Sequence, residues 1–419
     1  MLIRGVSWRP YRVPLRGHFT TAHGAIQWRE GIIVAIATAP GITGVGEIAP
    51  LSEFGGGNVS DALALLPEIA SNLRGQTTDE ALAWLNESVG AGVDVDAGWG
   101  SLPRPGSPHN NSLPTDEPTM PERGATQASP PPSTTTPAPT NDPTACGVEM
   151  ALLDALGKER GCSVGALLAP SAVEPQASVR VNAVIGARDA KMAAQAARQA
   201  AMAGYRCVKL KVGMEQDAES EIARIAQVRA AIGADVALRL DANEAWHVAQ
   251  AQAVLSRCAS YNIQYVEQPL PRADLDGLRA LRAAVDVPLA VDEALDSLGR
   301  ARALLADHAA AVFVMKPQIV GGLRVTRQII DEAAASGVQC VISSAIESGV
   351  GLAALLHLVA ALPAVTLECG LATGDLLADD LIVEVLPVID GAMAVPRGPG
   401  LGVSIDEEAM KSYGYERER

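Results

Sequence analysis

Residues 206–243 read RCVKLKVGMEQDAESEIARIAQVRAAIGADVALRLDAN. Two short apolar runs, each interrupted by charged side chains, flank one Ala-containing stretch with helical spacing of its apolar residues. A strand, a helix and a second strand in this order are typical of a parallel β/α unit. The segment therefore predicts parallel strands covered by helices.

The same alternation extends over residues 178–370. Ala-rich helical stretches separate eight apolar runs, which read SVRVNAVIG, RCVKLKVG, VALRLDAN, IQYVEQP, PLAVDE, AVFVMKP, QCVISSA and VTLECG. Eight such units favour a closed α/β barrel. A doubly wound open sheet is the alternative, but it usually has fewer strands, and no glycine-rich phosphate loop follows the first run.

The chain before the barrel is organised differently. Residues 1–50 contain β-rich runs bounded by Gly and Pro, whereas residues 61–73, 78–85 and 145–159 have helical patterns. Residues 88–143 turn to Pro, Thr, Ser, Asn and Gly and contain 12 of the 27 prolines. This composition cannot bury enough apolar surface to offset its ordering entropy, so we expect a disordered surface insertion.

Composition excludes some classes of function. With 419 residues and 48% hydrophobic residues the chain can bury a large core, and a net charge of −15 disfavours nucleic-acid binding. Six cysteines without a C-x-x-C pair favour a reducing compartment over a disulfide framework. The first residues do not resemble a signal peptide, and the most apolar stretch, residues 351–365, is too short to span a membrane. We therefore expect a soluble cytoplasmic protein without membrane or nucleic-acid partners; the sequence leaves open whether it forms a homo-oligomer.

Ionisable residues close five successive runs in the order Lys211, Asp241, Glu267, Asp292 and Lys316. The steps between them are 30, 26, 25 and 24 residues, about one β/α unit each. Any one of them alone reads as an ordinary strand-end charge. Five in succession predict a convergent group at the carboxyl ends of the strands, where barrel active sites are built.

The three carboxylates of this group predict a metal site. Crowded together, Asp241, Glu267 and Asp292 would repel without a compensating cation, and an all-oxygen set suits Mg²⁺, with Mn²⁺ as a substitute. Lys209 and Lys211 lie on the same face of one strand. We expect their mutual repulsion and desolvation to lower the lysine pKa, which would suit a base that removes a proton next to a substrate carboxylate.

The motif set resembles the muconate-cycloisomerase-like subgroup of the enolase superfamily. The residues that carry the resemblance are VKLKV around Lys209 and Lys211, LDAN at Asp241, VEQP at Glu267, VDE at Asp292 and MKP at Lys316. The resemblance implies a (β/α)7β TIM-like barrel at residues 178–384, an α+β capping domain at 1–177, and a C-terminal segment, 385–419, that returns to the capping domain. Enzymes of this superfamily are known to pair a Lys or His base with Mg²⁺, so the chemistry described above matches an established mechanism of the superfamily.

The resemblance also implies roles for individual residues. Lys211 would remove the proton, Lys316 would act as a cation on the opposite face or as a second acid/base, and Lys209 would tune Lys211. Asp241, Glu267 and Asp292 would bind Mg²⁺, with Asn243 and Glu293 behind them. Ser343, Ser344, Glu347 and Thr20 would contact a small carboxylate substrate, and loops 20–24 and 55–57 would close over it.

Three further stretches, residues 46–57, 342–362 and 368–381, resemble the o-succinylbenzoate synthase family within this subgroup. That resemblance implies a syn dehydration in menaquinone biosynthesis. The alternatives are an N-succinylamino acid racemase, a dipeptide epimerase, a cycloisomerase and a non-catalytic scaffold. Dipeptide epimerases commonly carry Asp-x-Asp on the eighth strand, where this chain has Glu368-Cys369-Gly370.

Overall fold

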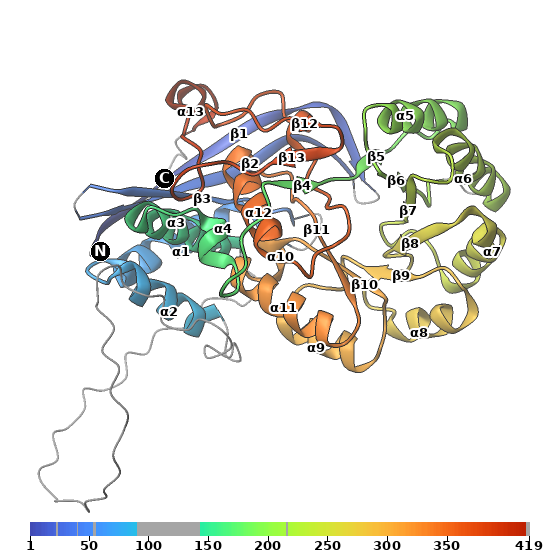
Figure 1. The fold of residues 1–419 in the computed structure, drawn as a ribbon, viewed down its shortest axis with the longest axis horizontal. Helices are drawn as coiled ribbons and strands as arrows, with labels where there is room; N and C mark the ends of the chain where they lie inside the picture. Colours follow the sequence, from blue (N-terminus) through green and yellow to red (C-terminus); the bar gives the residue numbers. More distant parts are fainter. Residues whose placement is uncertain (22–23, 40, 53–55, 90–142, 215–216, 416–419) are drawn as a thin grey trace, which may run out of the picture.

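The computed structural model describes residues 1–21, 24–39, 41–52, 56–89, 143–214 and 217–415. Two parts lie side by side, a small antiparallel sheet with helices and a curled parallel sheet ringed by helices (Figure 1). The expected insertion at 88–143 falls almost entirely on residues 90–142, outside the described residues. Among the described residues, no helix combines the length and the apolar character that a bilayer span requires.

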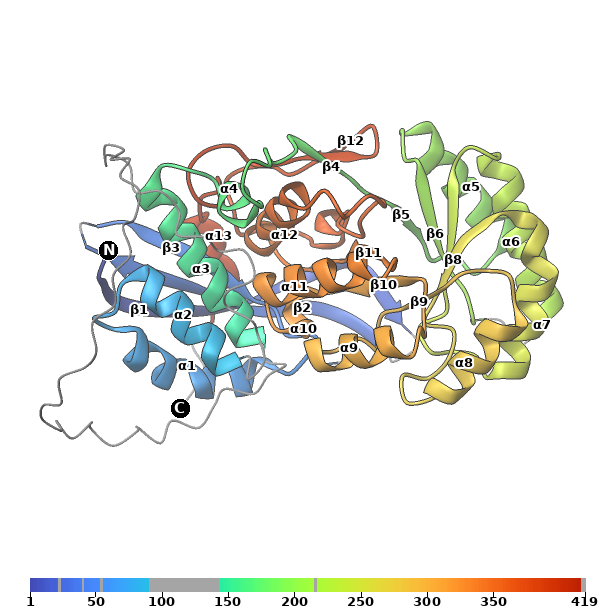
Figure 2. The same ribbon diagram turned by 60° about the horizontal axis from the view of Figure 1, so that its bottom comes forward.

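The first part is the capping domain. Its antiparallel sheet has the order β1-β2-β3, with β1 (Ile3–Thr21), β2 (Gly24–Thr38) and β3 (Thr43–Ile48), and four helices follow: α1 (Val59–Leu73), α2 (Thr78–Val89), α3 (Pro143–Arg160) and α4 (Val164–Leu168). Gly46 allows α3 to press onto β3, because a Cβ at that position would lie 2.1 Å from the carbonyl oxygen of Gly147. The long β1–β2 hairpin reaches from this sheet toward the barrel (Figure 2).

The second part is a barrel of parallel strands. The hydrogen-bonded order β11-β10-β9-β8-β7-β6-β5 follows the chain in reverse, as expected of successive β/α units. Its strands are β5 (Ala183–Ile185), β6 (Cys207–Lys211), β7 (Ala237–Asp241), β8 (Ile263–Glu267), β9 (Leu289–Val291), β10 (Val312–Met315) and β11 (Gln339–Ile342). The predicted α/β barrel with an α+β capping domain is thereby confirmed as the fold class.

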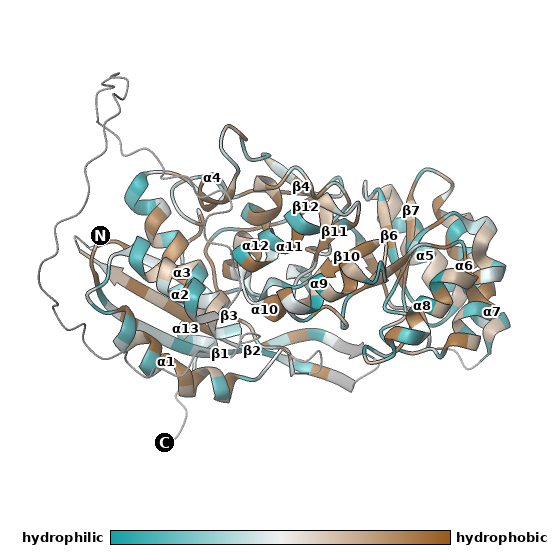
Figure 3. Cartoon of the chain, turned by 90° about the horizontal axis from the view of Figure 1, so that it is seen from below, coloured by the Kyte–Doolittle hydropathy of each residue, from teal (hydrophilic) through white to brown (hydrophobic). Residues whose placement is uncertain are grey.

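Helices cover the outside of the barrel. They are α5 (Ala190–Met202), α6 (Ala218–Ile232), α7 (Val248–Cys258), α8 (Leu275–Ala284), α9 (Leu298–Ala306) and α11 (Leu323–Ala335). The short helix α10 (Pro317–Val320) is buried and contacts α3 of the capping domain. Side chains of Asp189, Asp217, Asp274 and Ser297 accept hydrogen bonds from the first turns of α5, α6, α8 and α9, which explains where these helices begin. The outer helices carry hydrophilic and hydrophobic residues together, as amphipathic helices do (Figure 3).

The barrel closes through an irregular segment. The eighth predicted run, residues 365–370, forms no named strand, but Cys369 bridges to Val181 and Gly370 bridges to Ser343, both in parallel. The first run is divided into β4 (Ser178–Arg180) and β5. Both ends of the sheet are therefore joined by a few bridges, where the sequence pattern indicated full strands.

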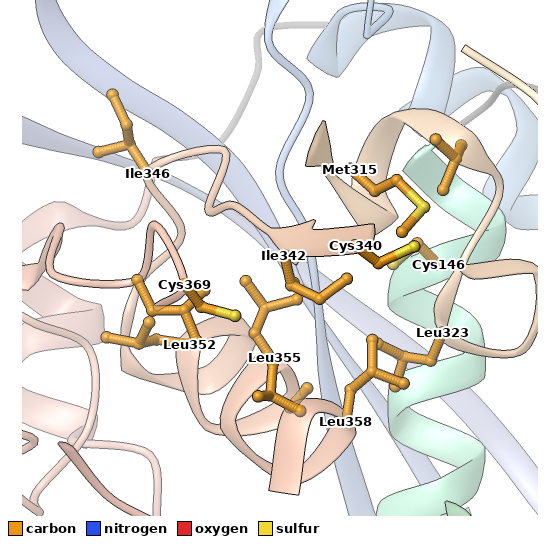
Figure 4. Close-up of a cluster of buried hydrophobic side chains, with 14 of the residues drawn as sticks. Cys146, Met315, Leu323, Cys340, Ile342, Ile346, Leu352, Leu355, Leu358 and Cys369 are labelled. Atoms are coloured by element: carbon orange, nitrogen blue, oxygen red, sulfur yellow. The ribbon is translucent and has the colours of Figure 1, made fainter. Parts of the chain in front are cut away.

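One core runs through both parts. Helix α12 (Gly349–Ala361) is buried along its whole length, and its Leu355 and Leu358 lie near Ile342 of β11 (Figure 4). Cys146 of α3 lies beside Cys340 in the same apolar cluster. Because capping helix and barrel strands share this cluster, their relative position is held by apolar packing.

The C-terminal segment contacts both parts. Strands β12 (Val388–Ile389) and β13 (Ala392–Ala394) form a separate three-stranded antiparallel sheet with β4, and α13 (Glu407–Tyr413) lies against β1. Gly414 forms an antiparallel bridge with Tyr11. The division at residues 178 and 384 stays a prediction.

Candidate active site

Strand register aligns three of the predicted site residues. Lys211 on β6 is paired with Asp241 on β7, and Asp241 is paired with Glu267 on β8. Asp292 directly follows β9, and Lys316 directly follows β10. All five lie at the carboxyl ends of successive strands, the end at which barrel enzymes place their active sites.

The lysines and carboxylates form buried ion pairs. Lys209 Nζ lies 2.9 Å from Glu267 Oε1 and 3.1 Å from Asp241 Oδ2, and Lys211 Nζ lies 2.7 Å from Asp241 Oδ2. On the other side, Lys316 donates to both carboxylate oxygens of Asp292. Each of the three carboxylates therefore has an ammonium partner that comes from another strand or the residue that follows one.

This pairing gives the lysine pKa a shift opposite in direction to the one expected from the sequence. Burial alone would lower the pKa of Lys209, but the carboxylates of Glu267 and Asp241 raise it well above its ordinary value. The pKa of Lys316 is raised as well, since Asp292 and Glu293 outweigh its burial. The prediction of a lowered pKa is wrong for Lys209, because burial, which lowers this pKa, is outweighed by two carboxylates within ion-pair distance of its ammonium group.

The carboxylates have features that fit a cation. Burial and the neighbouring Asp241 raise the pKa of Glu267 to about 7, and its Oε2 atom is buried without a hydrogen-bond partner. Within the described ranges, no three His, Cys, Asp or Glu side chains are arranged to hold a metal. Instead, Lys209 donates a hydrogen bond to Glu267 and Lys316 donates one to Asp292. An all-oxygen donor set with a buried, unpartnered oxygen fits Mg²⁺, provided that the carboxylates exchange lysine contacts for the ion.

Asn243 connects the elements around these carboxylates. Its backbone N–H donates to Asp241 Oδ1 at 3.1 Å, its Nδ2 donates to Glu293 Oε1 at 2.9 Å, and its Oδ1 accepts from Lys211 Nζ at 2.6 Å. Burial and Asp292 raise the pKa of Glu293 to about 8. The structure thus places Asn243 between Asp241 and Glu293, and the roles of Asn243 and Glu293 behind a metal ion stay a prediction.

The predicted substrate residues after β11 form a separate buried group. The hydroxyl of Ser344 donates to Glu347. It also accepts two hydrogen bonds of 2.9 Å, from the N–H of Ile346 and from the hydroxyl of Thr373. Burial raises the pKa of Glu347 to about 7. Ser343 bridges to Gly370 at the barrel closure. Ser344 and Glu347 bind each other in this structure, and substrate contact of Ser343, Ser344 and Glu347 stays a prediction.

Parts of the predicted lid lie outside the described residues. These are residues 22–23 and 55, together with the side chains of Thr20 and Thr21. Gly56 is described and exchanges backbone hydrogen bonds with Leu51. Closure of these loops over a substrate stays a prediction.

Sequence reasoning missed buried charges that the capping domain adds to this region. Glu47 of β3 is fully buried and accepts hydrogen bonds from Tyr11, Ser348 and Gly351. Arg29 of β2 donates to the carbonyl oxygen of Ile346 at 2.9 Å. A charge inside the otherwise apolar strand GVGEI was the signal that could have identified Glu47, by the same logic that identified the barrel carboxylates.

A groove opens on the capping side of this region. It has a volume of about 480 Å³ and is lined by β2 from Ile26 to Glu30, by residues 50–52, by the start of α1 and by Ile346. Two of its residues, Ile26 and Leu51, pack with Ile319, which also borders a small cavity against Asp292 and Lys316. The groove is therefore linked by apolar packing to the charged group at the barrel mouth.

Comparison with known families identifies the chain. Residues 191–409, just over half of the sequence, match the model of the family described as Enolase C-terminal domain-like. The chain belongs to the enolase superfamily, in its muconate-cycloisomerase-like branch. This assignment agrees with the resemblance seen in the strand-end motifs.

Individual relatives carry different activities. The chain is 34% identical over 205 residues to a chloromuconate cycloisomerase of Pseudomonas putida, which covers 49% of this chain and 55% of that relative. It is 36% identical over 221 residues to an o-succinylbenzoate synthase of Thermobifida fusca, covering 52% and 67% of the two chains. A hydrophobic dipeptide epimerase of Citrifermentans bemidjiense is 29% identical over 362 residues, covering 84% and 83%. The match thus spans only about half the length of the cycloisomerase.

Solved structures share the fold. A muconate lactonizing enzyme of Pseudomonas fluorescens superposes with a TM-score of 0.80 at 23% identity, covering 99% of each chain. An N-succinyl Arg/Lys racemase of Bacillus cereus has a TM-score of 0.79 at 23% identity, covering 99% and 98%. A dipeptide epimerase of Enterococcus faecalis, in complex with Mg and a dipeptide, has a TM-score of 0.77 at 23% identity, covering 96% and 100%.

Proposed function

We propose that the protein is a Mg²⁺-dependent o-succinylbenzoate synthase, which dehydrates 2-succinyl-6-hydroxy-2,4-cyclohexadiene-1-carboxylate to 2-succinylbenzoate. The observation that carries the proposal is the placement of two lysines on opposite sides of three carboxylates. Lys211 ends β6 and Lys316 follows β10, with the strand ends of Asp241, Glu267 and Asp292 between them. A substrate seated above the carboxylates would have one ammonium group on each side.

The chemistry divides between these groups. Asp241, Glu267 and Asp292 would hold Mg²⁺, which supplies positive charge next to the substrate carboxylate. Lys211 in its neutral form would take the proton next to that carboxylate and then return it to the departing hydroxyl on the same face. Lys316 would stay protonated and offset the negative charge that grows on the other side of the ring. Lys209 and Asn243, which both contact Asp241 as Lys211 does, would orient that lysine.

Sequence similarity and the lining of the groove favour dehydration over epimerisation. The Thermobifida fusca o-succinylbenzoate synthase is more similar in sequence, at 36% identity, than the dipeptide epimerase, at 29%. The apolar residues Ile26, Trp28 and Leu51 of the groove would suit a carbocyclic substrate with a succinyl arm.

A second candidate is epimerisation or racemisation, favoured by the epimerase match over 84% of the chain. The barrel closure speaks against a dipeptide substrate. Arg239 donates to the carbonyl oxygen of Glu368 at 2.6 Å and pairs with its carboxylate at 3.3 Å. The acidic side chain of the eighth segment is thus already paired with an arginine, which leaves it less available to the ammonium group of a dipeptide. N-succinylamino acids therefore form the competing substrate class.

The test offers both substrates to one preparation with Mg²⁺. Conversion of the cyclohexadiene to an aromatic product is followed by absorbance, and exchange of the α-proton of N-succinyl amino acids in D₂O is followed by NMR. Dehydration that disappears in Lys211→Ala and persists in Lys191→Ala, an exposed lysine of α5, supports the proposal. Racemisation of N-succinyl amino acids without dehydration would overturn it.

A further inference from the structure

We infer that Gln268 is a positioning residue that holds the three proposed metal ligands in one arrangement. The inference rests on the proposed metal site and adds to it a residue without metal contact. Gln268 directly follows Glu267 and is 2% exposed. Its side chain and its backbone both bind segments that follow the barrel strands.

The side chain of Gln268 fixes the segment after β9. Its Oε1 atom accepts from the backbone N–H of Asp292 and from that of Ala294, each at 3.1 Å. Its Nε2 donates to the carbonyl oxygen of Leu270 at 2.8 Å. One carboxamide therefore holds the backbone of Asp292 and ties it to the loop that follows Glu267.

The backbone of Gln268 also contacts the segment that carries Asp241, the third proposed ligand. Its N–H donates to the carbonyl oxygen of Ala290 at 2.9 Å, and its carbonyl oxygen accepts from the N–H of Glu244 at 2.9 Å. Glu244 lies three residues after Asp241. Gln268 thus contacts the segments that carry Asp241, Glu267 and Asp292.

The backbone at this junction is held in an uncommon conformation. Gln268, Asn243 and Glu244 have φ angles of +38°, +43° and +67°. Left-handed conformations at residues other than glycine cost energy and persist where surrounding contacts enforce them. The backbone hydrogen bond between Gln268 and Glu244 joins two such turns, and the side-chain bonds of Gln268 to Asp292, Ala294 and Leu270 help to hold the turn at Gln268.

Glutamine is the residue type that this position requires. The site needs an acceptor for two backbone N–H groups and a donor for one carbonyl, both at the end of a side chain with two methylenes. Methionine has a similar reach but would leave the N–H groups of Asp292 and Ala294 without their acceptor. Asparagine keeps the carboxamide but is one methylene shorter and cannot span the same partners.

The test measures binding of Mn²⁺ by the full chain, by electron paramagnetic resonance, without substrate. We expect the dissociation constant for Mn²⁺ to rise about 10- to 100-fold in Gln268→Met, the usual effect of losing an outer partner of a metal ligand. The control is Gln328→Met, on α11, whose carboxamide bonds to Glu332 of the same helix and should leave the constant unchanged. Unfolding in urea, measured on the metal-free proteins, separates the loss of stability from the loss of metal affinity.

The outcomes are distinct. A purely structural role would lower the unfolding free energy of Gln268→Met and leave its Mn²⁺ affinity equal to that of the wild type, which would overturn the inference. If Gln268→Met does not fold, Gln268→Asn decides by the same criterion. A wild-type chain that binds no Mn²⁺ would contradict the metal site of the proposed function, and the inference with it.

Discussion

The carboxylate of Glu47, on the capping sheet, accepts a hydrogen bond of 2.9 Å from the backbone N–H of Ser348, at the start of α12. It also accepts from the hydroxyl of Ser348 at 2.6 Å and from the N–H of Gly351 at 2.8 Å. The Glu47 side chain, in the capping domain, thereby accepts hydrogen bonds from N–H groups at the start of α12, which have no acceptor within that helix. The capping sheet is joined to the barrel mouth by this buried charge as well as by apolar packing.

Glu47→Gln should destabilise the protein. The amide would turn a donor toward groups that already donate, leaving at least one buried N–H without an acceptor, at about 1–3 kcal/mol. Unfolding in urea measures the change. Glu68→Gln, an exposed position on α1, is the control and should stay within about 0.5 kcal/mol of the wild type. Equal stability of both variants would show that Glu47 does not hold the domains together.

Lys211→Ala should lower kcat of dehydration by about 10²- to 10⁴-fold, the usual contribution of a positioned base. The substitution also removes an ammonium partner from Asp241, so metal affinity must be measured beside the rate. A loss of kcat with unchanged Mn²⁺ binding assigns Lys211 to proton transfer. Retained kcat would exclude Lys211 as the base.

Mg²⁺ should stabilise the folded chain. A ligand at about one hundred times its dissociation constant adds about 2.7 kcal/mol to the free energy of unfolding, and Asp292→Asn should abolish this gain. Thermal unfolding with and without Mg²⁺ checks both. The control is Asp235→Asn, an exposed carboxylate just before β7, which should keep the full gain. An equal gain in Asp292→Asn would place the ion elsewhere.

His357 should make stability depend on pH. Burial in α12 lowers its pKa to about 4, and its Nε2 contacts the carbonyl oxygen of Leu401 at 3.1 Å. The unfolded chain binds a proton below about pH 6.5, whereas the folded chain does not until about pH 4, so the contribution is full above pH 6.5 and is lost as pH falls toward 4. The loss amounts to about 3 kcal/mol at about 1.4 kcal/mol per pKa unit.

His357→Gln keeps a donor for Leu401 but cannot take up the proton. The free energy of unfolding, measured between pH 7 and pH 4, should fall less steeply in this variant than in the wild type. The comparison of slopes is decisive, because carboxylates elsewhere contribute equally to both proteins. Parallel curves would exclude His357 as a source of the pH dependence.

The sequence by itself determined the barrel and the positions of its strand-end charges. Apolar periodicity and the near-constant spacing from Lys211 to Lys316 depend only on how many residues one β/α unit needs. Those rules are local, so residues 263–267 and 289–291 could be recognised as strands without knowing their neighbours. The same rules placed Asp241, Glu267 and Asp292 at one end of the barrel.

Only the tertiary structure decided how these groups meet. The pKa of Lys209 rises rather than falls because Glu267, 58 residues away in the sequence, lies 2.9 Å from it. Glu47 and Ser348 are 301 residues apart, and the barrel closes at Cys369 through isolated bridges where the repeating pattern indicated a full strand. Local periodicity sets which face a side chain occupies, whereas the sign of a pKa shift and the partner of a buried charge depend on distances of a few ångströms, which only the packed fold establishes.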